Sequence, residues 1–244
     1  MDFLLTLNWV AVGQIILIDI LLGGDNAIVI ALACRNLPPA LRLKGILWGT
    51  AGAILIRVVL IAFAVNLLEM PYVQLVGGLL LFWIGIKLLA DTNQDHSGIT
   101  ASDRLLAAIK TIVIADLAMS IDNVIAVASA ATQAADEHQL LLVIFGILVS
   151  IPIIVWGSTV VLKLMTRFPL IVTFGAGLLG YLAGGMVFTD TGVGPWLQAQ
   201  MPVSHFLLPG TAVQISIPAV AGAAAVVLIG SWLAKRAAQR SVTP

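Results

Sequence analysis

Seven long apolar stretches, separated by short charged segments, make up most of this sequence and constrain its fold more than any other feature. Each is long enough to cross the hydrocarbon core of a membrane as a helix, which takes roughly 17 to 25 residues. The stretches are Asn8–Ala33, Leu43–Leu68, Tyr72–Ala90, Leu105–Ala131, Gln139–Met165, Leu170–Phe188 and Ala212–Ala234. A closed barrel would need short alternating segments that are absent, so we expect an all-α polytopic membrane protein with seven transmembrane helices.

The overall composition also indicates a membrane protein. Hydrophobic residues make up 60% of the chain and charged residues 10%, whereas soluble domains carry roughly 25% charged residues. The formal net charge of zero leaves no excess of basic residues to attract nucleic acid. Cys34 is the only cysteine, so the fold contains no internal disulfide.

The positions of the basic residues predict the orientation. With the N-terminus outside, eleven of the twelve lysines and arginines fall on the inner side of the seven spans. These are Arg35, Arg42, Lys44, Lys87, Arg104, Lys110, Lys163, Arg167, Lys235, Arg236 and Arg240. The charged residues on the outer side are acidic, at Asp2, Glu69, Asp136, Glu137 and Asp190. Since positive charge marks the cytoplasmic side, we predict an N-out, C-in topology in the cell membrane.

Five charged residues lie at membrane depth within the predicted spans. They are Asp19 and Asp25 in the first span, Arg57 in the second, and Asp116 and Asp122 in the fourth. A charge that faces lipid at this depth costs roughly 2.5 to 3.5 kcal/mol or more, so we expect each to face protein or water. We therefore look for the function at these residues.

The first and fourth spans carry two copies of one motif. An offset of 97 residues superimposes residues 15–33 on residues 112–130, with seven of nineteen positions identical. Three identical positions are polar: Asp19 pairs with Asp116, Asp25 with Asp122 and Asn26 with Asn123. Because three spans intervene, the second copy enters the membrane in the opposite direction, as in the inverted repeats of secondary transporters.

We accordingly predict a single transmembrane domain over residues 1–244. A first three-helix repeat (1–97) precedes its inverted copy (98–190), an outer loop (191–211), a seventh helix (212–234) and a cytoplasmic tail (235–244). The outer loop is expected to be an interfacial segment or a short surface helix. The motifs Gly45-x-x-x-Gly49 and Gly180-x-x-x-Gly184 predict close helix packing.

The duplicated polar residues predict a cation site near the middle of the membrane. With about 3.6 residues per helical turn, Asp19 and Asn26 share one helix face, and Asp116, Ser120 and Asn123 repeat that arrangement. The predicted metal ligands are Asp19, Asp25, Asn26, Asp116, Asp122 and Asn123, with Ser120 and Arg57 as accessory residues. This all-oxygen set suits magnesium, calcium or manganese, whereas softer metals would be expected to bring Cys or His ligands.

Four carboxylates around one dication leave excess negative charge. Some must be protonated, or paired with Arg57, when the site is empty. Protons that occupy the carboxylates after the metal leaves would give metal/proton exchange. Arg57 is then either a static counter-ion to one aspartate or part of a gate.

The segments Gly24-Asp25-Asn26-Ala27 and Ser120-Ile121-Asp122-Asn123-Val124 resemble the paired motifs of the TerC family of integral membrane proteins. The resemblance points to the YjbE-like branch, within the wider group of LysE-type transporters, and covers nearly the whole chain. It implies manganese export, alongside an older association with tellurium resistance, and it implies that both Asp-Asn pairs bind metal. Gly23-Gly24 replaces a more usual Ser-Leu-like pair, which leaves Ser120 as the hydroxyl ligand.

Residues and resemblance together lead us to expect a transporter that exports a divalent cation, with Mn²⁺ as the transported ion and protons as the coupling ion. We expect no enzymatic activity, and the lipid bilayer as the surrounding partner. The sequence leaves the oligomeric state open, a homo-oligomer included.

Two alternatives belong to other classes. A membrane metal-delivery or insertion factor would carry the same site and move no ion. An intramembrane aspartyl enzyme would use two aspartates as a proton-sharing dyad, yet the acids here form two duplicated pairs, each with an adjoining Asn. A seven-helix photoreceptor is excluded because the last span has no lysine for a Schiff base.

Overall fold

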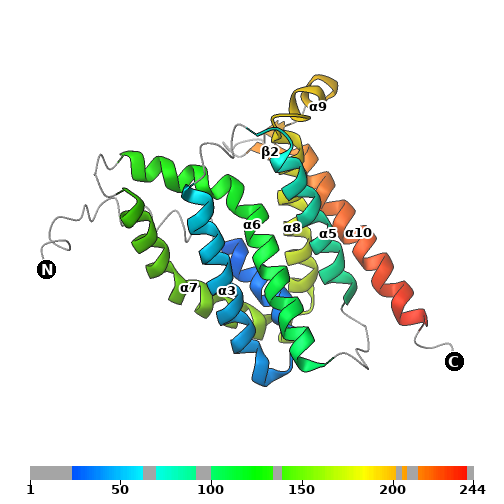
Figure 1. The fold of residues 1–244 in the computed structure, drawn as a ribbon. Helices are drawn as coiled ribbons and strands as arrows, with labels where there is room; N and C mark the ends of the chain where they lie inside the picture. The colour runs from blue at the N-terminus through cyan, green and yellow to red at the C-terminus, as the bar shows by residue number, and fades with distance from the viewer. Residues whose placement is uncertain are drawn as a thin grey trace, which may run out of the picture.

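The computed structural model describes residues 24–62, 70–91, 100–133, 139–201, 205–207 and 214–240, and these residues are almost entirely helical. A short helix, Gly24–Cys34, comes first. It is followed by α3 (Pro39–Ala62), α5 (Val73–Ala90), α6 (Ala101–Gln133), α7 (Gln139–Arg167), α8 (Leu170–Thr189), α9 (Gly194–Gln200), β1 (His205–Leu207), β2 (Gln214–Ser216) and α10 (Ile217–Arg240), as Figure 1 shows.

The predicted apolar helices are present wherever the structure describes them. Among the described residues, α3, α5, α8 and α10 are each long and apolar enough to cross a membrane, and Gly24–Cys34 is a shorter apolar helix. The part of the first predicted span that precedes residue 24 lies outside the described residues. The prediction of an all-helical membrane protein is therefore confirmed as an architecture of several apolar helices.

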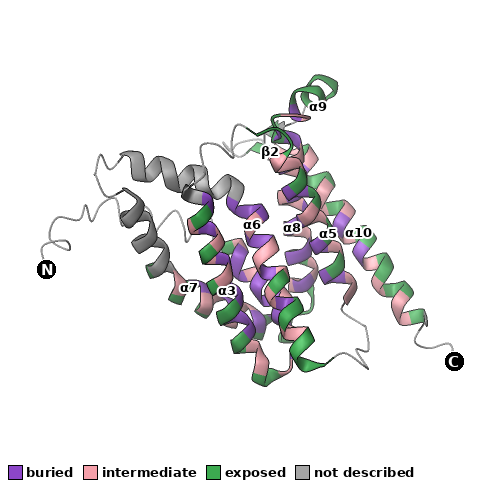
Figure 2. Ribbon diagram, in the orientation of Figure 1, coloured by how far each residue is buried: buried purple, intermediate pink, exposed green. Residues whose placement is uncertain are grey.

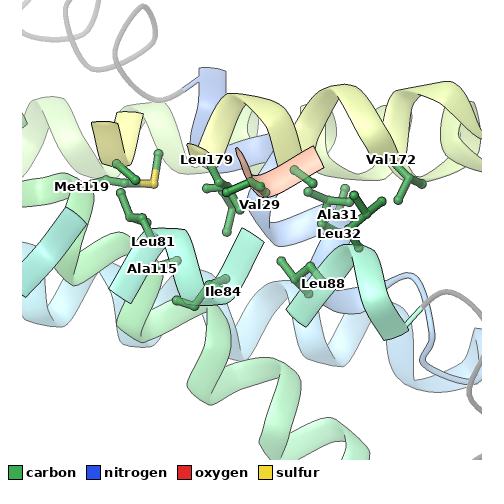
Figure 3. Close-up of a cluster of buried hydrophobic side chains, with 14 of the residues drawn as sticks. Val29, Ala31, Leu32, Leu81, Ile84, Leu88, Ala115, Met119, Val172 and Leu179 are labelled. Atoms are coloured by element: carbon green, nitrogen blue, oxygen red, sulfur yellow. The ribbon is translucent and has the colours of Figure 1, made fainter. Parts of the chain in front are cut away.

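The helices pack as two groups with the Gly24–Cys34 helix between them (Figure 1). Helices α5, α8 and α10 form one group, and α3 packs along α6 in the other. Val29 and Leu32 of the intervening helix join a core cluster with residues of α5 and α8, part of which Figure 3 shows. Ile30 belongs to a second cluster with residues of α3 and α6. One short helix thus contacts both groups.

Glycines allow α8 and α10 to approach closely. A Cβ added at Gly180 would lie 2.5 Å from the carbonyl oxygen of Gly222, and one at Gly184 would meet the carbonyl oxygen of Pro218. Residues later in α8 contact residues earlier in α10, so the two helices are antiparallel. The predicted packing role of the motif Gly180-x-x-x-Gly184 is confirmed.

Large apolar side chains cover the outside of the bundle. Trp48, Trp156 and Leu170 are 66%, 69% and 82% exposed, and Figure 2 shows similar exposed positions along the described helices. Such extensive exposed apolar surface needs an apolar environment. The hydrocarbon of a membrane supplies it.

Asp190 ties the end of α8 to the start of α5. Its Oδ2 accepts a hydrogen bond from the backbone N–H of Leu75 at 3.1 Å, and its Oδ1 accepts bonds from Gly192 and Val193 at 2.8 and 3.1 Å. Burial of this carboxyl group, which is 1% exposed, acts to raise its pKa. The backbone N–H groups outweigh that effect, so the pKa of Asp190 lies below its ordinary value.

The segment between α8 and α10 contains a short helix and a small β-ribbon. Helix α9 agrees with the expected surface helix, but the antiparallel pairing of β1 with β2, in which Phe206 faces Ile215, was not predicted. Helix α10 begins at Ile217, five residues later than expected, because Ser216 caps it and Pro218 suits a first turn. It also extends to Arg240, beyond the predicted end of the seventh helix.

Candidate functional site

Helix α3 places Arg57 inside the protein through its buried face. Residues Ile46, Thr50, Ala53, Arg57 and Leu60 recur every three or four positions and are all buried. This spacing forms one continuous face of a helix. Arg57 is 4% exposed, so its guanidinium lies within the bundle and away from lipid.

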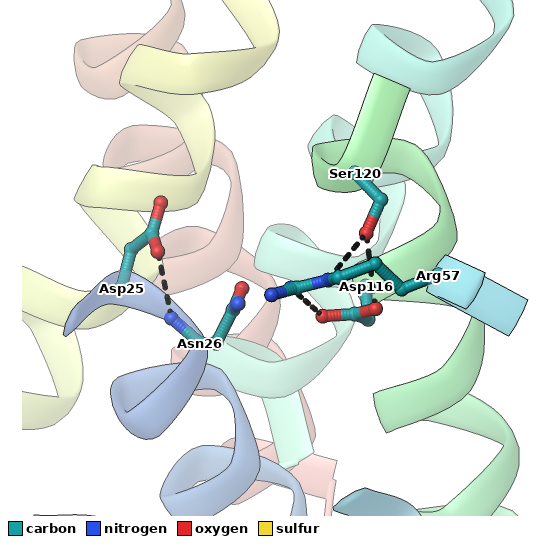
Figure 4. A network of polar contacts seen from close by, with 5 residues as sticks. All are labelled: Asp25, Asn26, Arg57, Asp116 and Ser120. Atoms are coloured by element: carbon teal, nitrogen blue, oxygen red, sulfur yellow. Dashed lines mark hydrogen bonds and ion pairs between the residues drawn. The ribbon is translucent and has the colours of Figure 1, made fainter. Parts of the chain in front are cut away.

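Arg57 forms a buried network with Asp116 and Ser120, one turn apart on α6. Its Nη2 lies 2.6 Å from Asp116 Oδ1, and its Nε donates a hydrogen bond to Ser120 Oγ at 3.3 Å. The Ser120 hydroxyl donates to Asp116 Oδ2 at 3.0 Å. Both oxygens of the Asp116 carboxylate are therefore engaged, as Figure 4 shows.

Asp25 and Asn26 face this network from the first turn of the Gly24–Cys34 helix. The backbone N–H of Asn26 donates a hydrogen bond to Asp25 Oδ1 at 2.8 Å. The Asn26 carboxamide lies beside the end of the Arg57 guanidinium (Figure 4). Asn26 is 5% exposed, and its Oδ1 has no hydrogen-bond partner within the part of the chain that the structure describes.

This arrangement concentrates charge in a low-dielectric place. Charges taken out of water lose several kcal/mol of solvation each, and only a well-formed pair with further hydrogen bonds offsets the loss. The Arg57–Asp116 pair meets that requirement because Ser120 bonds to both side chains. The side-chain Oδ1 of Asn26 has no such partner in the described part of the chain, and a buried acceptor without a partner costs about 1–3 kcal/mol.

The structure brings together five of the residues predicted from the sequence: Asp25, Asn26, Arg57, Asp116 and Ser120. Asp19 lies outside the described residues. Asp122 and Asn123 lie on α6, further along from Asp116, but their side chains are outside what the structure describes. Within the described residues, no three Asp, Glu, His or Cys side chains are grouped closely enough to hold a metal ion.

Thr50 is a buried polar residue of α3 that the sequence did not single out. It lies two turns before Arg57 on the same buried face of α3, is 3% exposed, and its hydroxyl has no hydrogen-bond partner in the described ranges. The seven-residue spacing from Arg57 was the signal that could have identified it.

A pocket of about 270 Å³ opens where α5 ends and α6 begins. Asn36, Lys87, Asp91, Asp103 and Arg104 supply its polar lining. Thr111 also lines it, five residues before Asp116 on α6. The pocket thus extends along α6 toward the buried network.

An apolar bundle that buries a charged network defines the class of polytopic membrane proteins with a polar site at membrane depth. Residues 4–239 match the integral membrane protein TerC family, and the chain belongs to this family. The resemblance that the two Asp-Asn motifs indicated is thereby confirmed.

The chain is similar to several bacterial membrane proteins of uncharacterized function. It is 42% identical over 192 residues to membrane protein YjbE of Bacillus subtilis strain 168, covering 79% of this chain and 85% of YjbE. Membrane protein YceF of the same strain is 25% identical over 210 residues, 82% of this chain and 77% of YceF. The inner membrane protein YgdQ of Escherichia coli K12 is 31% identical over 134 residues, 48% of this chain and 56% of YgdQ. No solved structure matched the chain.

Proposed function

We propose that this protein exports a divalent metal cation, with Mn²⁺ as the favoured substrate, in exchange for protons. The observation that carries the proposal is the buried Oδ1 of Asn26 beside the Arg57–Asp116 pair, which has no hydrogen-bond partner among the described residues. Carboxylate and amide oxygens suit hard and borderline dications. A cation bound between Asn26 and the neighbouring carboxylates would satisfy this oxygen. The choice of manganese and the outward direction rest on the resemblance to the TerC family.

The proposed ligand set combines described and undescribed residues. Asp25, Asn26 and Asp116 supply oxygens from two helices that face each other. Asp19, Asp122 and Asn123 complete the set, with Ser120 and Arg57 as accessory residues. Protons would neutralise the carboxylates after the metal leaves.

Helix directions support two inverted repeats. Helices α5 and α8 begin at Val73 and Leu170, which are separated by the same 97 residues as the two Asp-Asn motifs. A Cβ at Gly78 would approach Ala183 and one at Gly85 would approach Ala176, so these third helices of the two repeats are antiparallel. Opposite directions are what inversion requires.

Contacts between α3 and α6 support the predicted topology of seven spans. Helix α3 contacts α6 in parallel, since Gly45 lies near Leu105 while Arg57 reaches Asp116 and Ser120. Two spans separated by one intervening span cross a membrane in the same direction. With the N-terminus outside, the pocket at Asp91 and Asp103 opens on the cytoplasmic side and supplies an access route for the ion.

Flux of Mn²⁺ into proteoliposomes tests the proposal. Wild-type protein should move Mn²⁺, and Asp25→Asn and Asp122→Asn should each reduce the rate on the order of tenfold or more, since even outer-shell metal partners contribute about 10- to 100-fold. The control is Lys235→Gln, the loss of an exposed charge toward the end of α10 and away from the pocket, which should retain nearly full flux.

Four results would contradict parts of the proposal. Unchanged flux in both site variants would defeat the site assignment. Flux that ignores a proton gradient and moves no protons would defeat antiport. Absence of Mn²⁺ flux by folded wild-type protein would favour the metal-delivery or insertion factor, and a cleavage product lost on Asp25→Asn would favour an intramembrane aspartyl enzyme.

A further inference from the structure

Both oxygens of the Asp116 carboxylate already accept a hydrogen bond from a neighbouring side chain. Arg57 Nη2 lies 2.6 Å from one of its oxygens, and the Ser120 hydroxyl donates to the other. A dication that binds Asp116 competes with the guanidinium, because two positive centres on one buried carboxylate repel each other strongly at this depth.

On the other side of the guanidinium lies an oxygen that has no hydrogen-bond partner among the described residues. Asn26 Oδ1, on a side chain 5% exposed, lies beside the end of Arg57 and makes no hydrogen bond within the described residues. A buried acceptor without a partner costs free energy, and a cation that binds it removes this cost. An incoming ion could bind this oxygen directly, whereas the oxygens of Asp116 are already bound by Arg57 and Ser120.

The two repeats differ at this position. The 97-residue offset that aligns Asp19 with Asp116 aligns Arg57 with Ile154. Ile154 is 8% exposed and belongs to an apolar cluster with Ile30 and Ala53. At this aligned position only the first repeat provides a basic side chain, and it reaches across to the aspartate of the second repeat.

We propose that Arg57 is a tethered counter-cation that occupies the Asp116 half of the site when the site is empty and is displaced by the transported dication. This inference rests on the proposed function and names the device that regulates the same site. The guanidinium lowers the affinity for the ion by competing for Asp116. It also helps release the ion by returning to Asp116, so that no uncompensated buried carboxylate remains.

Displacement and a static structural role predict opposite effects on binding. A static partner only holds the helices together, so its removal would weaken ion binding or leave it unchanged. Removal of a competitor tightens equilibrium binding and slows transport. The decisive readout is therefore the pair of values, affinity and flux, for the same variant.

The experiment measures equilibrium binding of Mn²⁺ to the full chain in detergent, from the free Mn²⁺ signal in electron paramagnetic resonance, and Mn²⁺ flux in proteoliposomes. Arg57→Gln should bind Mn²⁺ on the order of tenfold more tightly, within the range of about 5- to 150-fold typical of coupling between binding events, and should transport it more slowly. The gain should disappear in the double variant Arg57→Gln/Asp116→Asn. Arg42→Gln, the same change on α3 away from the network, should bind as wild type does.

If folded Arg57→Gln binds Mn²⁺ no more tightly than wild type does, the displacement of Arg57 is overturned. Mn²⁺ flux by the wild type would still support the transport proposal in that case. Tighter binding by Arg57→Gln without flux by the wild type would support displacement and defeat transport. If Arg57→Gln does not fold, Arg57→Lys takes its place, because a single ammonium holds Asp116 less well than the planar guanidinium. Tighter binding of Mn²⁺ by Arg57→Lys supports the proposal, and unchanged binding overturns it. Absence of Mn²⁺ binding by every variant would overturn the site itself.

Discussion

At the scale of single residues, Asp190 has a structural role that its position at the end of a span did not reveal. The sequence placed it on the outer side as one acid among several. In the structure its carboxylate accepts hydrogen bonds from backbone N–H groups of Leu75, Gly192 and Val193. Leu75 is in the first turn of α5, where N–H groups have no partner within the helix. Asp190 therefore caps a helix from a distant segment.

This role makes stability depend on pH. The pKa of Asp190 is lower in the folded protein than its ordinary value of about 3.9, so its contribution is complete above the ordinary value and is lost as the pH falls through the folded value. Asp190→Asn should lower the free energy of unfolding by about 1–3 kcal/mol at pH 7. Thermal unfolding in detergent from pH 6 to pH 3 should show the two proteins converging below about pH 4. Parallel curves would contradict this role.

The residues of the buried network were predictable as a set, but their pairing was not. Helix periodicity placed Asp116 and Ser120 on one face, and the depth of Arg57 required a counter-ion. The identity of that counter-ion depends on how α3 lies along α6. That alignment is set by contacts between residues distant in sequence, such as Gly45 with Leu105. Local patterns do not specify such contacts.

At the scale of helices, length and hydropathy predicted the elements well because the apolar stretches are long. Helix α5 begins at Val73 and ends at Ala90, within one residue of the predicted span. Boundaries set by capping were harder to predict. The start of α10 depends on Ser216 and Pro218, and the residues before it pair as β2. Hydropathy alone extends the span back to Ala212 because those residues are also apolar or weakly polar.

Two adjacent glycines on α8 allow the helix contact to be tested. A Cβ at Gly184 would meet the backbone of Pro218 on α10, whereas one at Gly185 would meet nothing within 4 Å. Gly184→Ala should therefore push α8 and α10 apart and destabilise the protein by about 1–3 kcal/mol. Gly185→Ala should stabilise it slightly, since Ala favours a helix over Gly by about 0.8–1 kcal/mol. Thermal midpoints in detergent measure both, and equal shifts for the two variants would contradict the packing.

At the scale of the whole molecule, the short Gly24–Cys34 helix joins the two helix groups at the site. One face packs through Leu32 with α5 and α8, and the other through Ile30 with α3 and α6. Its first turn carries Asp25 and Asn26, and the Asn26 side chain lies beside the end of Arg57 (Figure 4). A shift of this short helix relative to α3 and α6 would therefore move Asn26 against the Arg57–Asp116 pair.

The predicted orientation can be tested with single cysteines. Gln200 on α9 and Lys235 on α10 are both exposed, and the N-out, C-in topology places them on opposite sides of the membrane. The native Cys34 is 0% exposed, so wild-type protein should react poorly with a membrane-impermeant maleimide and provides the background. In intact cells Gln200→Cys should be labelled and Lys235→Cys should be protected until the membrane is permeabilised. The reverse pattern would mean that the basic ends of these helices face outward, against the charge rule that predicts the topology.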